Sequence, residues 1–233
     1  MAALSSPAVA FLAVLGVAGT LPMHPTASQG LRPPDHLHQA AVKALAPGKL
    51  LVAARRLPDP NFGNAVIVLA DFNDDGAVGL VVNRRSDVTV ARVFPHLTPT
   101  LASAGQAFLG GPVEKTRPMV LLRASASPVE ARRVLDGVYL LTGREAIEAA
   151  VTSSTKPGHL RVYLGYSGWG PGQLEAETAE GVWHVLAGDP DAVFDPDPSS
   201  TWQRQIARTE LIQARGAEPA RRPRVSSSPA EWW

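Results

Sequence analysis

The segment from residue 165 to residue 173 (GYSGWGPGQ) has the residue types of a ligand-binding loop. Its glycines let a backbone approach a bound group closely, and Tyr166 and Trp169 offer flat faces for stacking. A helix predicted over residues 173–179 begins beside it, and a helix N-terminus attracts an anion. The alternative is a tight strand-to-helix corner in which Trp169 packs into the core. The candidate ligand contacts are Gly165, Tyr166, Gly168, Trp169, Gly172 and Gln173.

This segment matches none of the three glycine-rich motifs that have a defined chemistry. A nucleophile elbow needs Gly-x-Ser-x-Gly, but Trp169 stands at the position of the final glycine. A dinucleotide-binding fingerprint needs a third glycine where Gln173 stands. A phosphate-binding P-loop needs a lysine, which the segment lacks. The chemistry that we expect is therefore close backbone approach and stacking.

A second glycine turn, formed by Gly110, Gly111 and Pro112, follows another expected strand. If the two glycine segments face each other, they form the walls of a cleft for a flat ligand such as a nucleotide or a flavin. Tyr166 or Trp169 would then stack on that ligand. The alternative is that the turn only reverses the chain.

Other catalytic and metal-binding patterns are incomplete. Residues 71–76 (DFNDDG) match the first half of a calcium loop, but Val82 replaces the glutamate at its last position, so we interpret them as a hairpin turn. The chain has no cysteine and no His-Glu-x-x-His, which excludes thiolate chemistry and that class of zinc protease. A pair of Ser167 with His159 or His184 stays open. We predict no catalytic residue, no metal and no cofactor.

The elements that position these residues alternate between strands and helices. Apolar runs of strand length cover residues 50–54, 65–70, 77–82, 108–109, 119–122, 138–141, 160–166 and 182–187, the second and third forming a hairpin closed at Gly76. Two capping-box patterns, beginning at Ser127 and at Thr142, predict helix starts, and a last helix covers residues 200–214 with Trp202, Ile206, Thr209 and Ile212 or Gln213 on one stripe. This order favours an α+β fold.

Both ends differ from the middle. Residues 9–21 form a charge-free apolar run of 13 residues, shorter than the ~20 that span a bilayer. They suit the apolar part of a secretory signal, but residues 1–8 hold no lysine or arginine. A weak signal peptide, an early start codon with Met23 as the true start, and a disordered tail all stay open. We predict no transmembrane span and a cytoplasmic protein, with export as the alternative.

Four segments follow from these patterns. Residues 1–30 form an apolar leader, residues 31–47 a linker with a short helix over 35–45, residues 48–213 a single folded domain, and residues 214–233 a flexible tail rich in Arg, Pro and Ser. With 45% apolar residues, the chain has enough apolar surface for a core.

Charge argues against direct reading of DNA. The whole chain has a net charge of +1, and residues 49–213 carry 16 basic and 18 acidic residues. Three arginine doublets, at residues 55–56, 84–85 and 132–133, are interpreted as solvated or ion-paired surface, because neighbouring residues of a strand point to opposite faces. Only the tail combines arginines, which can bind phosphates, with aromatic residues that can stack on bases, Trp232 and Trp233.

Five motifs in order make the chain similar to the YqgE/AlgH family. They are residues 48–52 (GKLLV), 57–62 (LPDPNF), 76–84 (GAVGLVVNR), 109–113 (LGGPV) and 164–175 (LGYSGWGPGQLE), and Trp183 and Trp202 fall where the family has tryptophans. The resemblance covers about residues 48–210.

The resemblance implies a single α+β domain with a β-barrel-like core of mostly antiparallel strands, flanked by helices. One branch of this family is named as a regulator of alginate and virulence gene expression, and the resemblance brings no catalytic residues with it. We therefore expect a non-enzymatic regulator of gene expression that acts through an unknown protein or small-molecule partner. The alternative is a nucleotide- or flavin-binding domain, and the sequence leaves the oligomeric state open.

Overall fold

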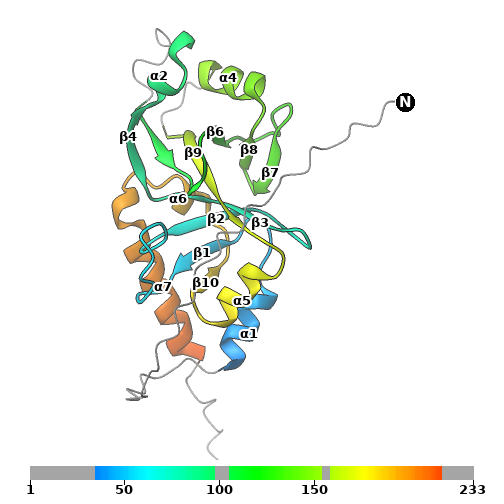
Figure 1. The fold of residues 1–233 in the computed structure, drawn as a ribbon, viewed down its shortest axis with the longest axis vertical. Helices are drawn as coiled ribbons and strands as arrows, with labels where there is room; N and C mark the ends of the chain where they lie inside the picture. Colours follow the sequence, from blue (N-terminus) through cyan, green and yellow to red (C-terminus); the bar gives the residue numbers. More distant parts are fainter. Residues whose placement is uncertain (1–34, 98–104, 154–157, 217–233) are drawn as a thin grey trace, which may run out of the picture.

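The computed structural model describes residues 35–97, 105–153 and 158–216 (Figure 1). The expected leader and residues 217–233 of the expected tail lie outside these ranges. The strands are β1 (Leu50–Ala53), β2 (Val66–Asn73), β3 (Gly76–Val81), β4 (Arg85–Thr89), β5 (Gln106–Leu109), β6 (Val113–Arg123), β7 (Arg132–Leu135), β8 (Val138–Leu141), β9 (Leu160–Trp169) and β10 (Trp183–Leu186). The helices are α1 (Asp35–Lys43), α2 (Val90–Val93), α4 (Arg144–Ser153), α5 (Gln173–Ala179), α6 (Pro190–Val193) and α7 (Thr201–Gly216), with 3-10 turns at Pro95–Leu97 and Pro198–Ser200.

The strands form one sheet in the order β10-β1-β2-β3-β9-β6-β8-β7, and β5 adds β4 at the side of β9. The β5–β9 ladder is parallel, whereas the other ladders are antiparallel. The α+β prediction is confirmed. The expected barrel-like core needs correction, because the two end strands, β10 and β7, do not pair with each other and the sheet stays open.

The first strands are continuous apolar runs because both of their faces are covered. In β1, Leu50 and Val52 join one apolar cluster, which includes Ile206 of α7 and two residues of α6, Ala192 and Val193. Leu51 and Ala53 join the opposite cluster, which includes Leu174 of α5. Figure 1 shows α7 on one side of these strands and α1 with α5 on the other. A third cluster, at the other end of the molecule, packs α2 and α4 on β6, β8 and β9.

Most of the predicted elements are present, and the hairpin is one of them. Asn73 of β2 pairs with Gly76 of β3, and Gly76 has a φ of +127° as its turn requires. The helix predicted from Thr142 is α4. In α7, Ile206 and Thr209 are buried as expected, whereas Ile212 is 54% exposed.

The helix predicted from Ser127 is wrong. A turn occupies residues 129–130, where Glu130 has a φ of +57°, and strand β7 follows. Residues 136 and 137, Asp-Gly, form the two-residue turn between β7 and β8, and this dipeptide is a strong hairpin signal. The long-range ladder to β8 thus prevails over the local capping pattern.

Two backbone segments cross in close contact where the β5–β6 connection passes over β9. The amide of Gly110 donates to the carbonyl of Leu164 (2.9 Å), and the carbonyl of Gly110 accepts from the Val81 amide (2.9 Å). A Cβ on Gly110 would lie 2.1 Å from the carbonyl oxygen of Gly165, and one on Gly111 would lie 2.2 Å from the carbonyl carbon of Tyr166. The glycines are therefore required by the contact between these two segments.

An aromatic cluster joins β9 to α5. Trp169 is 2% exposed, stacks on Phe62 (6.2 Å between ring centroids) and meets Trp183 edge-to-face (6.0 Å). Glu177 Oε2 accepts from both indoles, with distances of 2.9 Å to Trp169 Nε1 and 2.7 Å to Trp183 Nε1. One carboxylate therefore satisfies both indole donors and ties α5 to the sheet.

We expect Trp169→Ala to lower the free energy of unfolding by about 3–5 kcal/mol, because it empties a buried ring site and removes one indole from Glu177. Urea denaturation measures the loss. Val129→Ala is the control, because Val129 is 85% exposed. A Trp169→Ala protein as stable as the wild type would refute the core position of this ring.

We expect Gly110→Ala to cost about 3 kcal/mol, because the new methyl group must displace the backbone of Gly165. Gly170→Ala is a matched control, because the atom nearest to its new Cβ would be Gln173 Oε1, at an ordinary contact distance of 3.9 Å. Thermal unfolding of both variants compares them. Equal losses at the two positions would contradict the tight crossing.

Candidate functional site

A cleft with a volume of about 210 Å³ opens beside the backbone crossing. The ends of β3 and β5, the β5–β6 connection and the loop of residues 59–64 surround it. We call it the Arg84 cleft, and its lining residues are Asn61, Val81, Arg84, Leu109, Gly111, Pro112, Lys115 and Leu164. Two cationic side chains thus meet a mostly apolar wall.

Arg84 holds one rim of the cleft in place. Its guanidinium donates to the carbonyl oxygens of Gly63 (2.7 Å) and Asn61. Next to it, the Asn83 side chain accepts from the Val66 amide and donates to the Asn64 carbonyl, both at 2.9 Å. These bonds fix the 59–64 loop against the sheet.

Burial lowers the pKa of Arg84, and the charge of Asp59 opposes this shift. An arginine keeps its charge at neutral pH despite such a shift. The Asp59 carboxylate itself accepts from the amides of Asn61 (2.7 Å) and Phe62 (2.9 Å), so the loop already uses it. Asp59 is not among the lining residues of the cleft, whose charged side chains are Arg84 and Lys115.

Lys115 supplies the second charge. It is exposed on β6, and it forms no ion pair within the described part of the chain. Leu109, which is 46% exposed, adds apolar surface at the mouth. This combination suits a ligand that has an anionic group and an apolar or flat body.

The cleft contains only part of the predicted site. Gly111 and Pro112 line it, whereas Gly110 and Gly165 form the crossing behind it. Tyr166 is half-buried near Glu114, and Gly168 lies against the Tyr166 ring. Ligand contact by these residues stays a prediction.

Stacking of Trp169 on a ligand does not fit this structure, because the ring is buried in the aromatic cluster. Gly172 precedes α5 with a φ of +72°, and the Gln173 side chain accepts from the Gly170 amide and donates to Glu177. The 165–173 segment thus has the strand-to-helix corner that we gave as its alternative.

Sequence reasoning missed Asn61, Arg84 and Lys115. The interpretation of Arg84 and Arg85 as a solvated or ion-paired doublet does not reveal that Arg84 lines the cleft, while its neighbour Arg85 donates to the Pro196 carbonyl. The motif at residues 57–62 was the available signal for the Asn61 loop. Lys115 is a single lysine on a long strand, and no local pattern distinguishes it.

Two further polar residues have structural partners. Ser167 is fully buried and donates to the Gly110 carbonyl (3.2 Å), while His184 contacts Gln213, so this serine and histidine are not paired. Arg161 is 7% exposed and donates to the carbonyls of Val82 (3.1 Å) and Val193 (2.7 Å). Burial lowers the pKa of Arg161. Arg161 thus joins β9 to α6 and to the residue that follows β3.

The described residues contain no group of three or more His, Asp or Glu side chains placed to hold a metal ion. Among the helices of the described ranges, none has the length and apolarity needed to cross a membrane.

Comparison with known proteins identifies relatives along most of the chain. A family model described as AlgH-like (DUF179) matches residues 50–212. A UPF0301 protein of Anaeromyxobacter is 39% identical over 186 residues, which cover 76% of this chain and 93% of the relative. A UPF0301 protein of Streptomyces avermitilis is 36% identical over 167 residues, which cover 69% of this chain and 85% of the relative.

Two solved structures share the fold. The solution structure of the AlgH protein from Pseudomonas aeruginosa has a TM-score of 0.58 and 27% identity, and the match covers 86% of this chain and 100% of that protein. A crystal structure of a Corynebacterium diphtheriae protein has a TM-score of 0.61 and 24% identity, over 70% of this chain and 87% of that one. With its motifs, fold and relatives in agreement, the chain belongs to the AlgH-like family, UPF0301.

Proposed function

We propose that this protein is a non-enzymatic regulator that acts in the cytoplasm and influences gene expression indirectly, through a partner or ligand held at the Arg84 cleft. The observation that carries the proposal is the cleft itself. Its two cations, Arg84 and Lys115, face a mostly apolar wall, and its lining within the described ranges includes no carboxylate. Such a surface favours an anionic group on the partner.

The charge of the folded part supports indirect action. Residues 49–213 carry two more acidic than basic residues, and DNA-binding domains instead display a basic surface. A cleft of about 210 Å³ is also too small for a duplex, but it has room for a peptide side chain or for part of a small ligand.

Small-molecule binding is the second candidate function, and the same cleft favours it. Gly111 and Pro112 bring backbone to the wall, and Leu109 and Leu164 supply apolar contact for a flat body. A phosphate group of a nucleotide or flavin would meet Lys115, because this side chain has no ion pair within the described ranges.

AMP and FMN are suitable probes of the second candidate, measured by isothermal titration calorimetry. We expect weak binding that added salt reduces, and an affinity about fivefold lower for Lys115→Ala, because one exposed charge contact contributes about 1 kcal/mol. Lys43→Ala, on α1, is the matched control and keeps the wild-type affinity. If neither probe binds, the nucleotide and flavin form of the proposal fails.

Regulation is tested by transcript profiling in the native host. A strain that carries Lys115→Glu in place of the wild-type gene is expected to show the expression changes of a deletion strain, because the charge reversal repels the anionic partner. Lys43→Glu, at an equal protein level, is expected to behave as wild type. If the Lys115→Glu strain and the wild type have identical transcript profiles, the cleft has no regulatory role and the proposal fails.

A further inference from the structure

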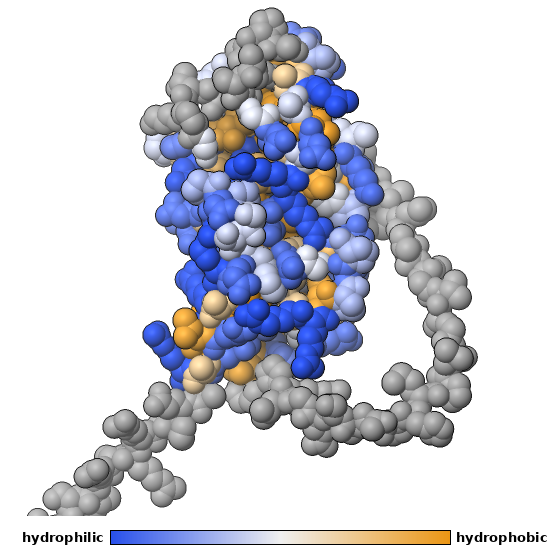
Figure 2. Space-filling model, turned by 90° about the vertical axis from the view of Figure 1, so that its left-hand side faces the viewer, coloured by the Kyte–Doolittle hydropathy of each residue, from blue (hydrophilic) through white to orange (hydrophobic). Residues whose placement is uncertain are grey.

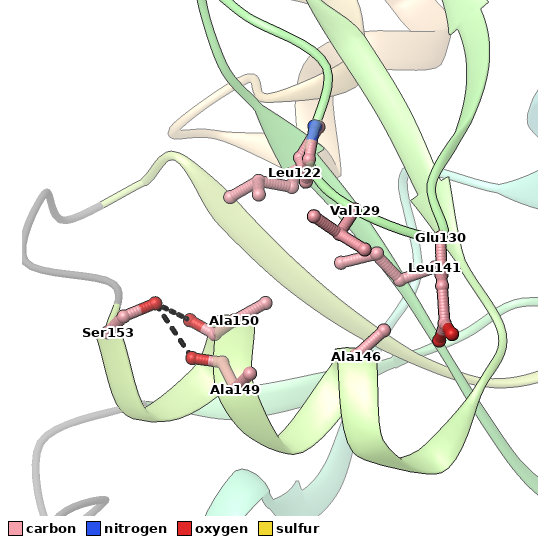
Figure 3. Close-up of a pocket in the computed structure, with 9 residues that line it drawn as sticks. Leu122, Val129, Glu130, Leu141, Ala146, Ala149, Ala150 and Ser153 are labelled. Atoms are coloured by element: carbon pink, nitrogen blue, oxygen red, sulfur yellow. Dashed lines mark hydrogen bonds between the residues drawn. The ribbon is translucent and has the colours of Figure 1, made fainter.

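A larger apolar groove lies at the end of the molecule where α4 packs on β6 and β8 (Figure 3). We call it the α4 groove. Its volume is about 420 Å³, and its lining residues are Leu122, Pro128, Val129, Glu130, Leu141, Ala146, Ala149, Ala150 and Ser153. In Figure 3, Leu122, Val129 and Leu141 project toward the alanines of α4 across an open space. Small residues on that helix leave the space unfilled.

The groove has an acidic rim. Glu130 lies beside the start of α4, where its Oε2 would be 3.7 Å from a Cβ on Gly143. Glu145 stands one turn before Ala149 and so borders the same face of the helix. Neither glutamate forms an ion pair with any residue that the structure describes.

A complementary surface lies on α7. Leu211 and Ile212 are 60% and 54% exposed, although both are large aliphatic residues. Arg208 and Arg215 flank them at helical spacing, and both arginines lack ion-pair partners in the described ranges. We call these four residues the α7 ridge. Figure 2 shows apolar surface among hydrophilic residues at this lower end of the molecule.

We propose that the α7 ridge of one copy docks in the α4 groove of a second copy of this chain. Leu211 and Ile212 enter the apolar groove, and Arg208 and Arg215 face Glu130 and Glu145 on its rim. An amphipathic helix that lies in an apolar groove is a common recognition mode, and the opposite charges set its orientation.

The contact is head-to-tail. Figure 1 places α4 at one end of the long axis and the last turns of α7 at the other. A symmetric contact between two ridges would bring four arginines together, and one between two grooves would bring four glutamates together. The charges therefore favour the contact between a ridge and a groove. Each dimer formed in this way still has one unoccupied groove and one unoccupied ridge.

The test uses two single variants of the full chain and their mixture. Leu211→Asp disables the ridge, and Ala149→Arg obstructs the groove and repels the incoming arginines. Both positions are exposed, so both variants are expected to fold. Sedimentation velocity is expected to show a wild-type mass that rises with concentration beyond that of a dimer. Each variant alone stays monomeric, and an equal mixture forms a one-to-one dimer and nothing larger.

Gln203→Glu on α7 and Thr116→Arg on β6 are the matched controls, since both are exposed and lie outside the two surfaces. They are expected to associate as wild type, and added salt is expected to weaken the association. A wild-type protein that stays monomeric at its highest soluble concentration overturns the proposal. So does a mixture that fails to restore the dimer, because that result indicates a symmetric contact or an unlike partner.

Discussion

The arrangement of β3, β5 and β9 depends on the crossing of two backbone segments at Gly110–Gly111 and Gly165–Tyr166. No side chain fits between them, and the hydrogen bonds of Gly110 reach both Leu164 on β9 and Val81 on β3. This contact seats the end of β5 against two strands that are far apart in sequence. The end of β5 and the β5–β6 connection lie at this crossing, and they supply Leu109, Gly111 and Pro112 to the lining of the Arg84 cleft.

Local signals predicted much of the fold. The hairpin around Gly76, the start of α4 and the buried stripe of α7 depend on neighbours in sequence, and the structure contains all three. The failure at Ser127 shows the limit of such signals. A capping pattern and an Asp-Gly turn competed there, and pairing of β7 with β8 decided between them. The openness of the sheet is likewise set by long-range pairing.

The candidate site was harder to predict than the fold. The glycines predict a ligand site because a glycine lets a bound group approach the backbone closely. At Gly110 and Gly165, however, the group that approaches is another segment of backbone. The charges of the cleft come from positions 84 and 115, which only the folded sheet brings together. A glycine-rich segment can therefore indicate where a cleft forms, while its chemistry resides in side chains from other elements.

The carboxylate of Glu177 binds two indoles, and this contact connects the docking of α5 to the optical spectrum of the protein. Trp169 and Trp183 stand 6.0 Å apart with an interplanar angle of 83°, so their electronic transitions couple in a fixed chiral geometry. One contribution to the near-ultraviolet circular dichroism of the protein thereby depends on Glu177 of a seven-residue helix. If α5 undocks while the sheet persists, both indoles lose this acceptor, and the contribution of the pair changes while the far-ultraviolet signal of the sheet remains.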